Sequence, residues 1–429
     1  MKAVILAGGK GTRLSKLIKN TPKPLIKIGG KPVIEHQILL LREYGIKEIW
    51  ILLGFLGSQI KEYLKNGEKW DINIHYCQEK KPLGTAGALK VLENEIKEDF
   101  LVLSGDVMLD FDLKRFISYH RKKNGIASII VHPNDHPFDS DLVEVDKEGQ
   151  VLSLLKRPHP SRLNFRNLSI ASAYIFSPKI FKYTPLKIKS DIEKDILPLI
   201  LKSKQKIYVY KTPEYIKDIG TPNRLMKVRK DYILGKIRKF NLKNKRKVVF
   251  LDRDGVINEE IDRLSRVEDL KIYDFSAKAI KKINEFGYLI IIITNQPMIA
   301  KGFMTEKDLD EIHQKLETEL GKQGAKIDAF YYCPHHPEKG FPGEIPELKI
   351  KCNCRKPKIG LFLKAKKDFN INLKSSYMIG DQTSDILAGE RAGCKTILVK
   401  TGYGGKDNLF KVKPIYIAKN LLEAVHFIK

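Results

Sequence analysis

The sequence has no long hydrophobic run and few cysteines. No apolar stretch approaches the ~18 residues of a membrane-spanning helix, and the run at residues 3–7 is too short for a secretion signal. Five cysteines in 429 residues are too few for a disulfide-stapled scaffold. We therefore expect a cytoplasmic protein without a membrane partner.

Acidic residues are scarce relative to basic ones. The 51 Asp and Glu stand against 78 Lys and Arg, which gives a formal net charge of +27. Such an excess suits nucleic acid, an anionic membrane or phosphorylated small molecules as partners. The lysines are spread along the whole chain, which weakens the nucleic-acid interpretation and leaves a solvated basic surface as the plain alternative. The hydrophobic content of 42% excludes a disordered chain.

Two series of short apolar runs alternate with helical patterns. The first series predicts strands at 2–7, 48–54, 72–77 and 100–104, with helices at 32–44 and 58–64. The second predicts strands at 248–251, 289–294, 376–379 and a last one at 396–399, with helices at 277–286 and 306–320. This alternation predicts an α/β protein with two doubly wound, Rossmann-like, mainly parallel sheets. We predict domains at 1–235 and 247–429, joined by a basic linker at 236–246; a nucleic-acid-binding arm is the alternative for that linker.

The first domain begins with a strand that runs into LAGGKGTRL (residues 6–14). Glycines let backbone N–H groups approach phosphate oxygens, and the guanidinium of Arg13 adds charge. The loop is neither a Walker A loop nor the dinucleotide fingerprint, because their spacings are not met. Further along, TPKPL holds Lys23, LGTAG (83–87) opens a helix, SGDV places Asp106 at a strand end, and YIKDIGTP carries Asp218.

These motifs, in this order, resemble the sugar-1-phosphate nucleotidyltransferase family over about 225 residues. The resemblance implies that Gly8, Gly9, Gly11 and Arg13 bind the triphosphate and that Lys23 neutralises charge at the reacting phosphate. It also implies that Gly84, Thr85 and Gly87 face the base, that Asp106 and Asp218 share Mg²⁺, and that Lys156 binds the sugar phosphate. The family's Glu-Lys-Pro is Leu155-Lys156-Arg157-Pro158 here, so the sugar is not readable from this pocket.

The second domain begins with LDRDGVIN, in which Asp252 and Asp254 follow a strand. Such a pair can divide nucleophilic attack from proton transfer. Thr294 ends a second strand in TNQ, Lys356 follows in CRKPKIG, and Asp381 comes at another strand end. This order resembles the haloacid dehalogenase-like phosphatases. By that resemblance Asp252 is the nucleophile and Asp254 the general acid/base, Thr294 and Lys356 stabilise the phosphoryl group, and Asp252, the carbonyl of Asp254 and Asp381 hold Mg²⁺. Asp385, one helical turn beyond Asp381, is expected as an exposed helix cap, with a place among the Mg²⁺ ligands as the alternative.

An insert between residues 333 and 360 supplies three cysteines and two adjacent histidines. Cys333, His335, Cys352 and Cys354 would form a closed tetrahedral Zn²⁺ site of structural type. His336 is an alternative to His335, and three free cysteines in a loop are the alternative to a metal site.

The motifs LDRDG, TNQ, CPHHP and CNCRKPKIG together resemble the D-glycero-D-manno-heptose 1,7-bisphosphate phosphatases over roughly 180 residues. The resemblance implies that Arg355, Lys356, Asn295 and Gln296 contact the substrate. The histidinol-phosphate phosphatases share this pattern and remain an alternative. Pro297 and Met298 stand where the family has Ser and Gly.

The two resemblances complement each other, because a heptose bisphosphate 7-phosphatase produces the sugar 1-phosphate that a nucleotidyltransferase consumes. The family's route through the α-anomer uses GTP on this transferase fold. We therefore expect a bifunctional enzyme of GDP-D-glycero-α-D-manno-heptose synthesis that uses GTP and sugar phosphates. The alternatives are a mannose-1-phosphate guanylyltransferase fused to another phosphatase and a regulatory or nucleic-acid-binding protein on decayed enzyme folds. The oligomeric state is not readable from the sequence.

Overall fold

The computed structural model describes residues 1–9, 14, 20–79, 81–160 and 162–428. The chain divides into two compact units. Unit 1 comprises Met1–His132, Val143–Leu155 and Ser169–Asn241, and unit 2 comprises Pro133–Leu142, Lys156–Leu168 and Leu242–Lys429. Two segments from the N-terminal half therefore belong to unit 2. We keep the predicted limits 1–235, 236–246 and 247–429 as a proposal for the two functional domains.

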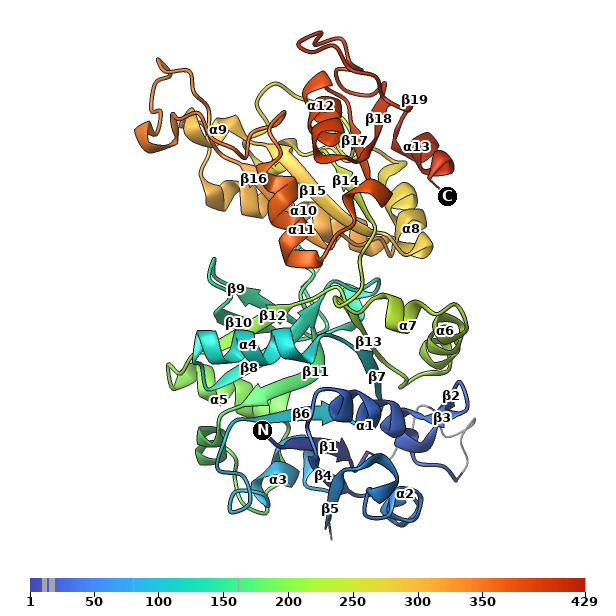
Figure 1. The fold of residues 1–429 in the computed structure, drawn as a ribbon. Coiled ribbons are helices and arrows are strands. Elements are labelled where there is room, and N and C mark those ends of the chain that lie inside the picture. The colour runs from blue at the N-terminus through green and yellow to red at the C-terminus, as the bar shows by residue number, and fades with distance from the viewer. Residues whose placement is uncertain (10–13, 15–19, 80, 161, 429) are drawn as a thin grey trace. The chain divides into compact units, whose positions relative to one another are not determined.

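Unit 1 contains a mixed sheet, which has nine strands within the described residues (Figure 1). Four neighbouring strands are parallel, in the order β5 (Asn73–Gln78), β4 (Glu48–Leu53), β1 (Ala3–Ala7) and β6 (Phe100–Ser104). Next to β6 lies β11 (Ser169–Phe176), which pairs with both β8 (Ala127–His132) and β9 (Leu142–Val145). Strand β12 (Ile207–Lys211) pairs with β8, and β10 (Val151–Leu155) pairs with β9. Strand β11 is antiparallel to β6 and β8. The predicted α/β class is confirmed, and β11 makes the sheet mixed.

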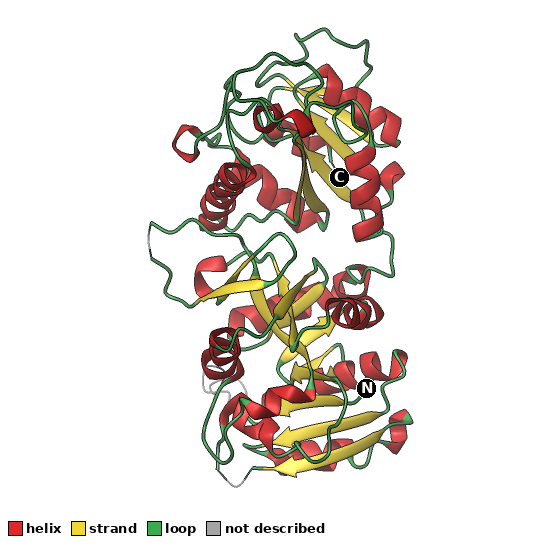
Figure 2. Cartoon of the chain, turned by 90° about the vertical axis from the view of Figure 1, so that its left-hand side faces the viewer, coloured by secondary structure: helices red, strands yellow, loops and turns green. Residues whose placement is uncertain are grey.

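Helices lie on either side of this sheet (Figure 2). They are α1 (Val33–Glu43), α2 (Gly57–Leu64), α3 (Gly84–Lys90), α4 (Leu113–Lys123), α5 (Leu197–Lys202), α6 (Pro222–Ile233) and α7 (Lys236–Lys239). Two short ribbons pair β7 (Val107–Asp110) with β13 (Tyr215–Asp218) and β2 (Lys27–Ile28) with β3 (Lys31–Pro32).

Unit 2 contains a parallel sheet, which has six strands within the described residues. Their order is β16 (Ala329–Cys333), β15 (Leu289–Asn295), β14 (Val248–Leu251), β17 (Tyr377–Gly380), β18 (Lys395–Val399) and β19 (Tyr416–Ala418). The helices are α8 (Ser276–Phe286), α9 (Pro297–Ala300), α10 (Glu306–Lys322), α11 (Gly360–Phe369), α12 (Thr383–Ala392) and α13 (Leu421–Phe427). The strand expected at 396–399 is present as β18, but it is not the last strand, because β19 follows it. The three residues of β19 at the sheet edge are too few to show a periodic pattern in the sequence.

The unit 2 sheet is buried on both faces because its strands are apolar throughout. In β14, Val248 and Phe250 belong to one core cluster, whereas Val249 and Leu251 belong to another. Side chains of a strand point alternately to opposite faces, so each face meets its own layer of helices. Helices pack on both faces of the central strands, and this packing fixes the carboxyl ends of the strands, from which the predicted site residues project.

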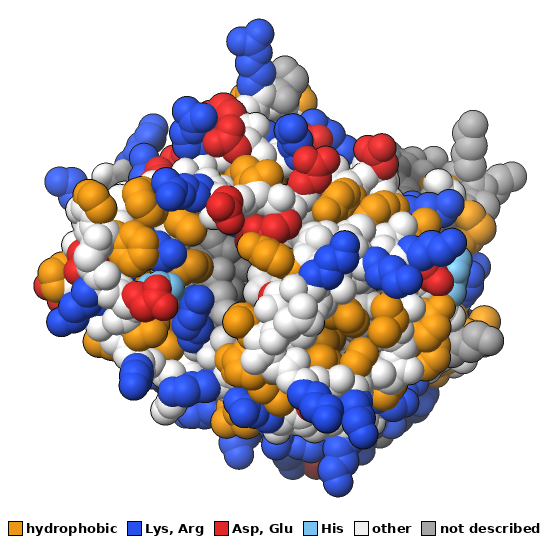
Figure 3. Space-filling view, turned by 90° about the horizontal axis from the view of Figure 1, so that it is seen from above, with side chains coloured by type: hydrophobic (Ala, Val, Ile, Leu, Met, Phe, Trp, Pro, Cys, Tyr) orange, Lys and Arg blue, Asp and Glu red, His pale blue; other side chains and the backbone are white. Residues whose placement is uncertain are grey.

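The basic stretch at residues 236–246 is structured rather than extended throughout. Its first residues form α7, in which Ile237 is buried in a core cluster of unit 1. Leu242 is buried in a cluster of unit 2. On the face of the molecule in Figure 3, Lys and Arg side chains are spread out instead of gathering in one patch. None of the helices in the described ranges is long and apolar enough to cross a membrane.

Candidate functional sites

The first candidate site lies at the carboxyl ends of β1 and β6 in unit 1, the edge at which open α/β sheets bind ligands. Gly8 follows β1 and lies against Gly54, which follows β4. A Cβ on Gly54 would lie 2.6 Å from the Gly8 carbonyl oxygen, so this contact requires a glycine. Among the described residues, no atom lies within 4 Å of a Cβ added to Gly9. Gly11 and Arg13 lie outside the described residues.

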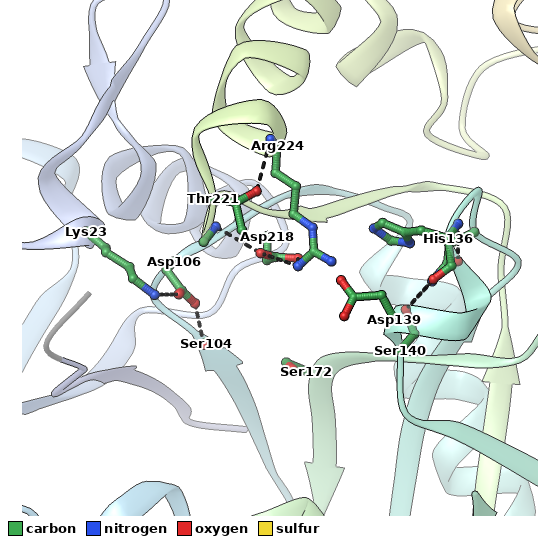
Figure 4. A network of polar contacts seen from close by, with 12 residues as sticks. Lys23, Ser104, Asp106, His136, Asp139, Ser140, Ser172, Asp218, Thr221 and Arg224 are labelled. Atoms are coloured by element: carbon green, nitrogen blue, oxygen red, sulfur yellow. Dashed lines mark hydrogen bonds and ion pairs between the residues drawn. The ribbon is translucent and has the colours of Figure 1, made fainter. Parts of the chain in front are cut away.

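Lys23 and Asp106 form an ion pair at this edge, with Nζ 2.6 Å from Oδ2 (Figure 4). Lys23 starts a short 3₁₀ helix between two prolines, which restricts its backbone. The Ser104 hydroxyl donates to the other oxygen of Asp106 at 2.9 Å. Gln37, fully buried on α1, donates its amide to the carbonyl oxygens of Ser104 and Val107 at 2.8 and 2.7 Å. This amide holds the turn that presents Asp106, and sequence patterns gave no sign of it.

Asp218 comes to the same turn because β13 pairs with β7, and the Ile219 N–H donates to the Asp106 carbonyl oxygen at 3.0 Å. Its carboxylate accepts two hydrogen bonds from Arg224 Nη1, at 3.1 and 2.8 Å, and one from the Gly220 N–H at 2.9 Å (Figure 4). Arg224 lies in the first turn of α6, which Thr221 caps. Sequence reasoning missed this arginine, although its position three residues after the DIGT motif was a usable signal.

The LGTAG loop packs against a distant segment of unit 1. A Cβ on Gly84 would lie 2.3 Å from the Ser190 carbonyl oxygen, and one on Gly87 would lie 2.5 Å from that of Ile188. Thr85 donates its hydroxyl to Asp191 Oδ2 at 3.1 Å and accepts from the backbone of residue 192 at 2.9 Å. These small residues therefore lock two loops together; contact of the same residues with a base remains a proposal.

Lys156 is exposed and lies in the segment Lys156–Leu168, which belongs to unit 2. Its predicted role toward the sugar phosphate stays a proposal.

The second candidate site lies at the tips of β14, β15 and β17. Lys356 places Nζ 2.9 Å from Asp252 Oδ2 and 2.6 Å from Asp385 Oδ1. Asp381 follows β17 and is fully buried; its carboxylate accepts from the Tyr403 N–H at 2.8 Å. Asp385 caps α12 as expected, but it is buried instead of exposed, with 1% of its surface accessible. Its burial makes it a member of the site.

Three buried carboxylates and one ammonium leave two negative charges unbalanced when all are ionised. Asp252, Asp381 and Asp385 offer oxygens that lie within 4.8 Å of one another, and Asp381 Oδ1 has no hydrogen-bond partner among the residues that the structure describes. Burial raises the pKa of Asp252 to about 7 and that of Asp381 to about 9. Although burial alone would lower the pKa of Lys356, the carboxylates of Asp252 and Asp385 raise it. Oxygen ligands with a double negative excess fit a divalent cation such as Mg²⁺.

Asp254 has a different environment from Asp252. Arg253 grips its carboxylate with two hydrogen bonds, Nε to Oδ1 at 3.0 Å and Nη2 to Oδ2 at 2.8 Å. The side-chain amides of Asn258 and Gln296 donate to it at 2.9 and 3.0 Å. The carboxylate of Asp254 is outside the three-carboxylate group, so only its main chain remains a candidate for the predicted Mg²⁺ contact. Arg253, between the two aspartates of LDRDG, was missed by sequence reasoning.

The remaining predicted residues surround the same tips. Thr294 is buried at 1% exposure and accepts from Gln296 Nε2 at 2.8 Å. Asn295 exchanges two hydrogen bonds with the Lys356 backbone, at 3.0 and 3.3 Å, and so fixes the residue that carries the ammonium. Arg355 donates to the His335 carbonyl oxygen at 3.5 Å, and burial lowers the pKa of its guanidinium. Substrate contacts of these side chains remain proposals.

A cavity of about 440 Å³ lies beside the carboxylates of the second candidate site. It is lined by Glu259, Glu260, Tyr273, Gly402 and Tyr403. Burial and the nearby charges of Asp254 and Asp252 raise the pKa of Glu260 to about 8. The cavity has room for a small polar substrate next to the buried site. Glu260 was not predicted, because an acidic residue after LDRDGVIN has no distinctive spacing.

Three cysteines and one histidine converge in the insert that follows β16. The Sγ atoms of Cys333 and Cys354 lie 3.1 Å apart, those of Cys352 and Cys354 lie 3.2 Å apart, and His335 Nδ1 lies 3.1 Å from Cys354 Sγ. These four donor atoms form a group that can hold a metal ion. His335, and not His336, belongs to it; His336 packs edge-on against Phe341. Closed coordination by four side chains is typical of a structural Zn²⁺.

Comparisons with known proteins agree with two enzymes in one chain. The Nucleotidyl transferase family model matches residues 2–234, and the HAD-hydrolase-like family model matches residues 353–424. The chain is 45% identical over 161 residues to a D-glycero-alpha-D-manno-heptose-1,7-bisphosphate 7-phosphatase of Photorhabdus laumondii, over 37% of this chain and 86% of that relative. It is 42% identical over 159 residues to a D-glycero-beta-D-manno-heptose-1,7-bisphosphate 7-phosphatase of Haemophilus ducreyi, over 37% of this chain and 85% of that relative.

The N-terminal part has relatives of a second kind. It is 34% identical over 241 residues to mannose-1-phosphate guanylyltransferase 1 of Arabidopsis thaliana, over 55% of this chain and 63% of that relative. The chain thus spans about three fifths of that transferase's length and most of the length of the phosphatases.

Proposed function

Because the chain belongs to the nucleotidyl transferase family and carries a haloacid dehalogenase-like phosphatase in its C-terminal part, we propose that it catalyses two consecutive steps on one sugar. The phosphatase removes the 7-phosphate of D-glycero-α-D-manno-heptose 1,7-bisphosphate. The transferase then joins the resulting heptose 1-phosphate to GMP from GTP and releases pyrophosphate. The observation that carries this proposal is the pairing of the two families, since the product of one reaction is the substrate of the other.

In the phosphatase step, Asp252 attacks the phosphorus of the 7-phosphate and forms an aspartyl phosphate. Asp254, held by Arg253 next to it, gives a proton to the departing sugar oxygen and later takes one from water. Lys356 and the Thr294 hydroxyl bind the phosphoryl oxygens. Asp252, Asp381 and the main-chain carbonyl of Asp254 would hold Mg²⁺, which would offset the repulsion between carboxylate and phosphate.

In the transferase step, the oxygen of the sugar 1-phosphate attacks the α-phosphorus of GTP in line with the leaving pyrophosphate. The backbone of Gly9, together with Gly8, Gly11 and Arg13, binds the triphosphate. Lys23 exchanges Asp106 for the reacting phosphate, and Asp106 would then be available to Mg²⁺; Asp218 would join it on release of Arg224. Positioning and charge neutralisation supply most of the catalysis.

The four-residue group of the insert holds a structural Zn²⁺ in this proposal. It anchors the loop in which Arg355 and Lys356 follow Cys354 directly, and the Arg355 N–H donates to Cys352 Sγ at 3.4 Å. The metal thus sets the position of the substrate-binding pair without taking part in the reaction.

The choice of substrate rests on the relatives. The phosphatases named above act, by their names, on the α- and β-anomers of one heptose bisphosphate. The transferase relative named above is a guanylyltransferase, which supports GTP. That relative's sugar is mannose 1-phosphate, which makes a mannose-1-phosphate guanylyltransferase joined to a phosphatase of other specificity the second candidate; histidinol phosphate is then a substrate to test.

The test is phosphate release from the α- and β-heptose 1,7-bisphosphates, fructose 1,6-bisphosphate and histidinol phosphate in Mg²⁺, with Asp252→Asn as the blank. We expect fast phosphate release from the α-anomer with the wild-type chain and none with Asp252→Asn. GDP-heptose should then form on addition of GTP. Turnover of mannose 1-phosphate with GTP and none of heptose 1-phosphate would instead establish the second candidate. Release from histidinol phosphate alone would end the heptose assignment.

A further inference from the structure

Helix α10 of unit 2 is covered by the segment Lys156–Leu168, which comes from the part of the sequence that the transferase family model matches. The Phe165 N–H donates to the Thr318 hydroxyl oxygen at 2.9 Å, and Phe165 is 2% exposed. The next residue, Arg166, places Nε 3.0 Å from Glu317 Oε2. The phosphatase unit thus includes an arginine that lies 86 residues before its first catalytic aspartate in the sequence.

Glu317 needs a cation at this place. Its side chain is 1% exposed, and a buried carboxylate without a partner is strongly destabilising. Within the described residues, the ion pair recorded for Glu317 is the one with Arg166. Arg166, whose side chain is 22% exposed, also places Nη1 3.6 Å from Asp310 Oδ1, so two carboxylates hold its guanidinium.

A continuous series of contacts leads from Arg166 to Asp254. The guanidinium of Arg166 lies 4.7 Å from the centre of the Phe330 ring. Phe330 stacks on His313 of α10, with ring centres 4.4 Å apart. His313 Nε2 lies 3.5 Å from Nη1 of Arg253, which is fully buried and grips the Asp254 carboxylate.

The His313 ring contacts the guanidinium of Arg253 on the side away from Asp254's two hydrogen bonds, through Nη1. Burial together with Arg253 and Arg166 lowers the pKa of His313, so the ring is neutral at pH 7 and offers Nε2 to Arg253. A neutral ring stacked under Phe330 cannot tilt unless Phe330 moves, and Arg166 covers Phe330. Arg253 binds both oxygens of Asp254, which also accept from Asn258 and Gln296, so a rotation of the guanidinium would pull the carboxylate away from those two amides.

We propose that Arg166 is a positioning residue for the phosphatase: through Phe330, His313 and Arg253 it holds the Asp254 carboxylate in the orientation for proton transfer. The inference rests on the proposed function, since that is where Asp254 is the general acid/base. Arg166 touches neither substrate nor reacting atoms.

The test compares two leaving groups in the full-length chain. A sugar alcohol needs a proton as it leaves, whereas p-nitrophenolate does not, and kcat/KM reports the step in which the leaving group departs. For Arg166→Ala we expect kcat/KM to fall about tenfold for heptose 1,7-bisphosphate and less than about twofold for p-nitrophenyl phosphate. Arg162→Ala, an exposed arginine of the same segment, is the matched control and should change neither value.

A second variant keeps the test valid if Arg166→Ala unfolds. The double change Arg166→Gln with Glu317→Gln removes the buried carboxylate along with its cation and still uncovers Phe330. We expect it to show the same selective loss for the sugar substrate. If a folded variant loses kcat/KM equally for both leaving groups, or for neither, the inference about Arg166 is overturned while the proposed function stands. A wild-type chain without either phosphatase activity would overturn the proposed function, and this inference with it.

Discussion

Lys356 and Asp385 face each other at 2.6 Å, Nζ to Oδ1, and each side chain is 1% exposed. The same ammonium lies 2.9 Å from Asp252, so one lysine serves two buried carboxylates. In the absence of a cation, this lysine neutralises one of the three negative charges that Asp252, Asp381 and Asp385 carry when all are ionised.

The change Lys356→Met is expected to inactivate the phosphatase and to destabilise unit 2. Removing one partner of a buried ion pair costs about 3 kcal/mol or more, because Asp252 and Asp385 are left without a counter-charge. Urea unfolding in a chelator measures the loss, and Mg²⁺ should recover part of it. Lys358→Met, at an exposed lysine two residues on, is the control and should leave both properties unchanged.

Loss of the ion pair between Lys23 and Asp106 is expected to lower the transferase activity and to leave the phosphatase activity unchanged. Lys23→Met should lower kcat for sugar nucleotide formation about 10²-fold, since one preorganised charge at the reacting phosphate is removed. Phosphate release by unit 2 serves as the internal control, and Lys27→Met, at an exposed lysine, as the matched variant. Loss of both activities in Lys23→Met would argue for misfolding instead.

Gly84 is required by close packing as well as by its backbone angle. Its φ is +73°, and an added Cβ would lie 2.3 Å from the Ser190 carbonyl oxygen. Gly30 has a φ of +84°, and no atom of the described residues lies within 4 Å of an added Cβ. The change Gly30→Ala therefore measures the cost of backbone strain without a steric clash. We expect Gly30→Ala to cost about 1 kcal/mol of stability and Gly84→Ala to cost more and to raise the KM for GTP. Equal effects of the two changes would contradict the packing argument.

Removal of the metal from the insert is expected to inactivate the phosphatase without touching the transferase. Cys354→Ser should abolish stoichiometric zinc, measured by mass spectrometry of the metal, and lower the melting temperature of unit 2. Cys77→Ser, at a half-buried cysteine of unit 1, is the control and should retain full zinc. One zinc per chain in Cys354→Ser would show that the four residues are not its ligands.

Glu260 is expected to make the metal-free protein less stable as the pH rises. Its pKa is about 8 in the folded protein and near 4.5 in the unfolded chain. The folded state therefore holds the proton more tightly, and the free energy of unfolding falls between pH 4.5 and about 8. Glu260→Gln removes this dependence, so its advantage in melting temperature over the wild type should grow from pH 5 to pH 8.5 in a chelator. Glu259→Gln, at an exposed neighbour, should show no such trend.

The α/β class and the two resemblances followed from the sequence because the chemistry lies at strand ends. Asp106, Asp252, Thr294 and Asp381 each end or follow an apolar run, and parallel strands bring their carboxyl ends to one edge. The group of three cysteines and one histidine was predictable for a similar reason, since its four side chains lie within 22 residues of chain. Local sequence patterns were sufficient to predict a site residue wherever its motif and the strand before it determine its position.

Only the tertiary structure decided what supports those residues. Arg224 on Asp218, Thr85 on Asp191, and Lys356 between Asp252 and Asp385 are contacts that no periodicity encodes. The burial of Asp385 and the place of Arg166 in unit 2 were invisible for the same reason. A sequence specifies which face of an element is apolar, but the partner that each polar side chain meets depends on how distant elements pack, and packing at near-crystalline density admits only the partners that fit.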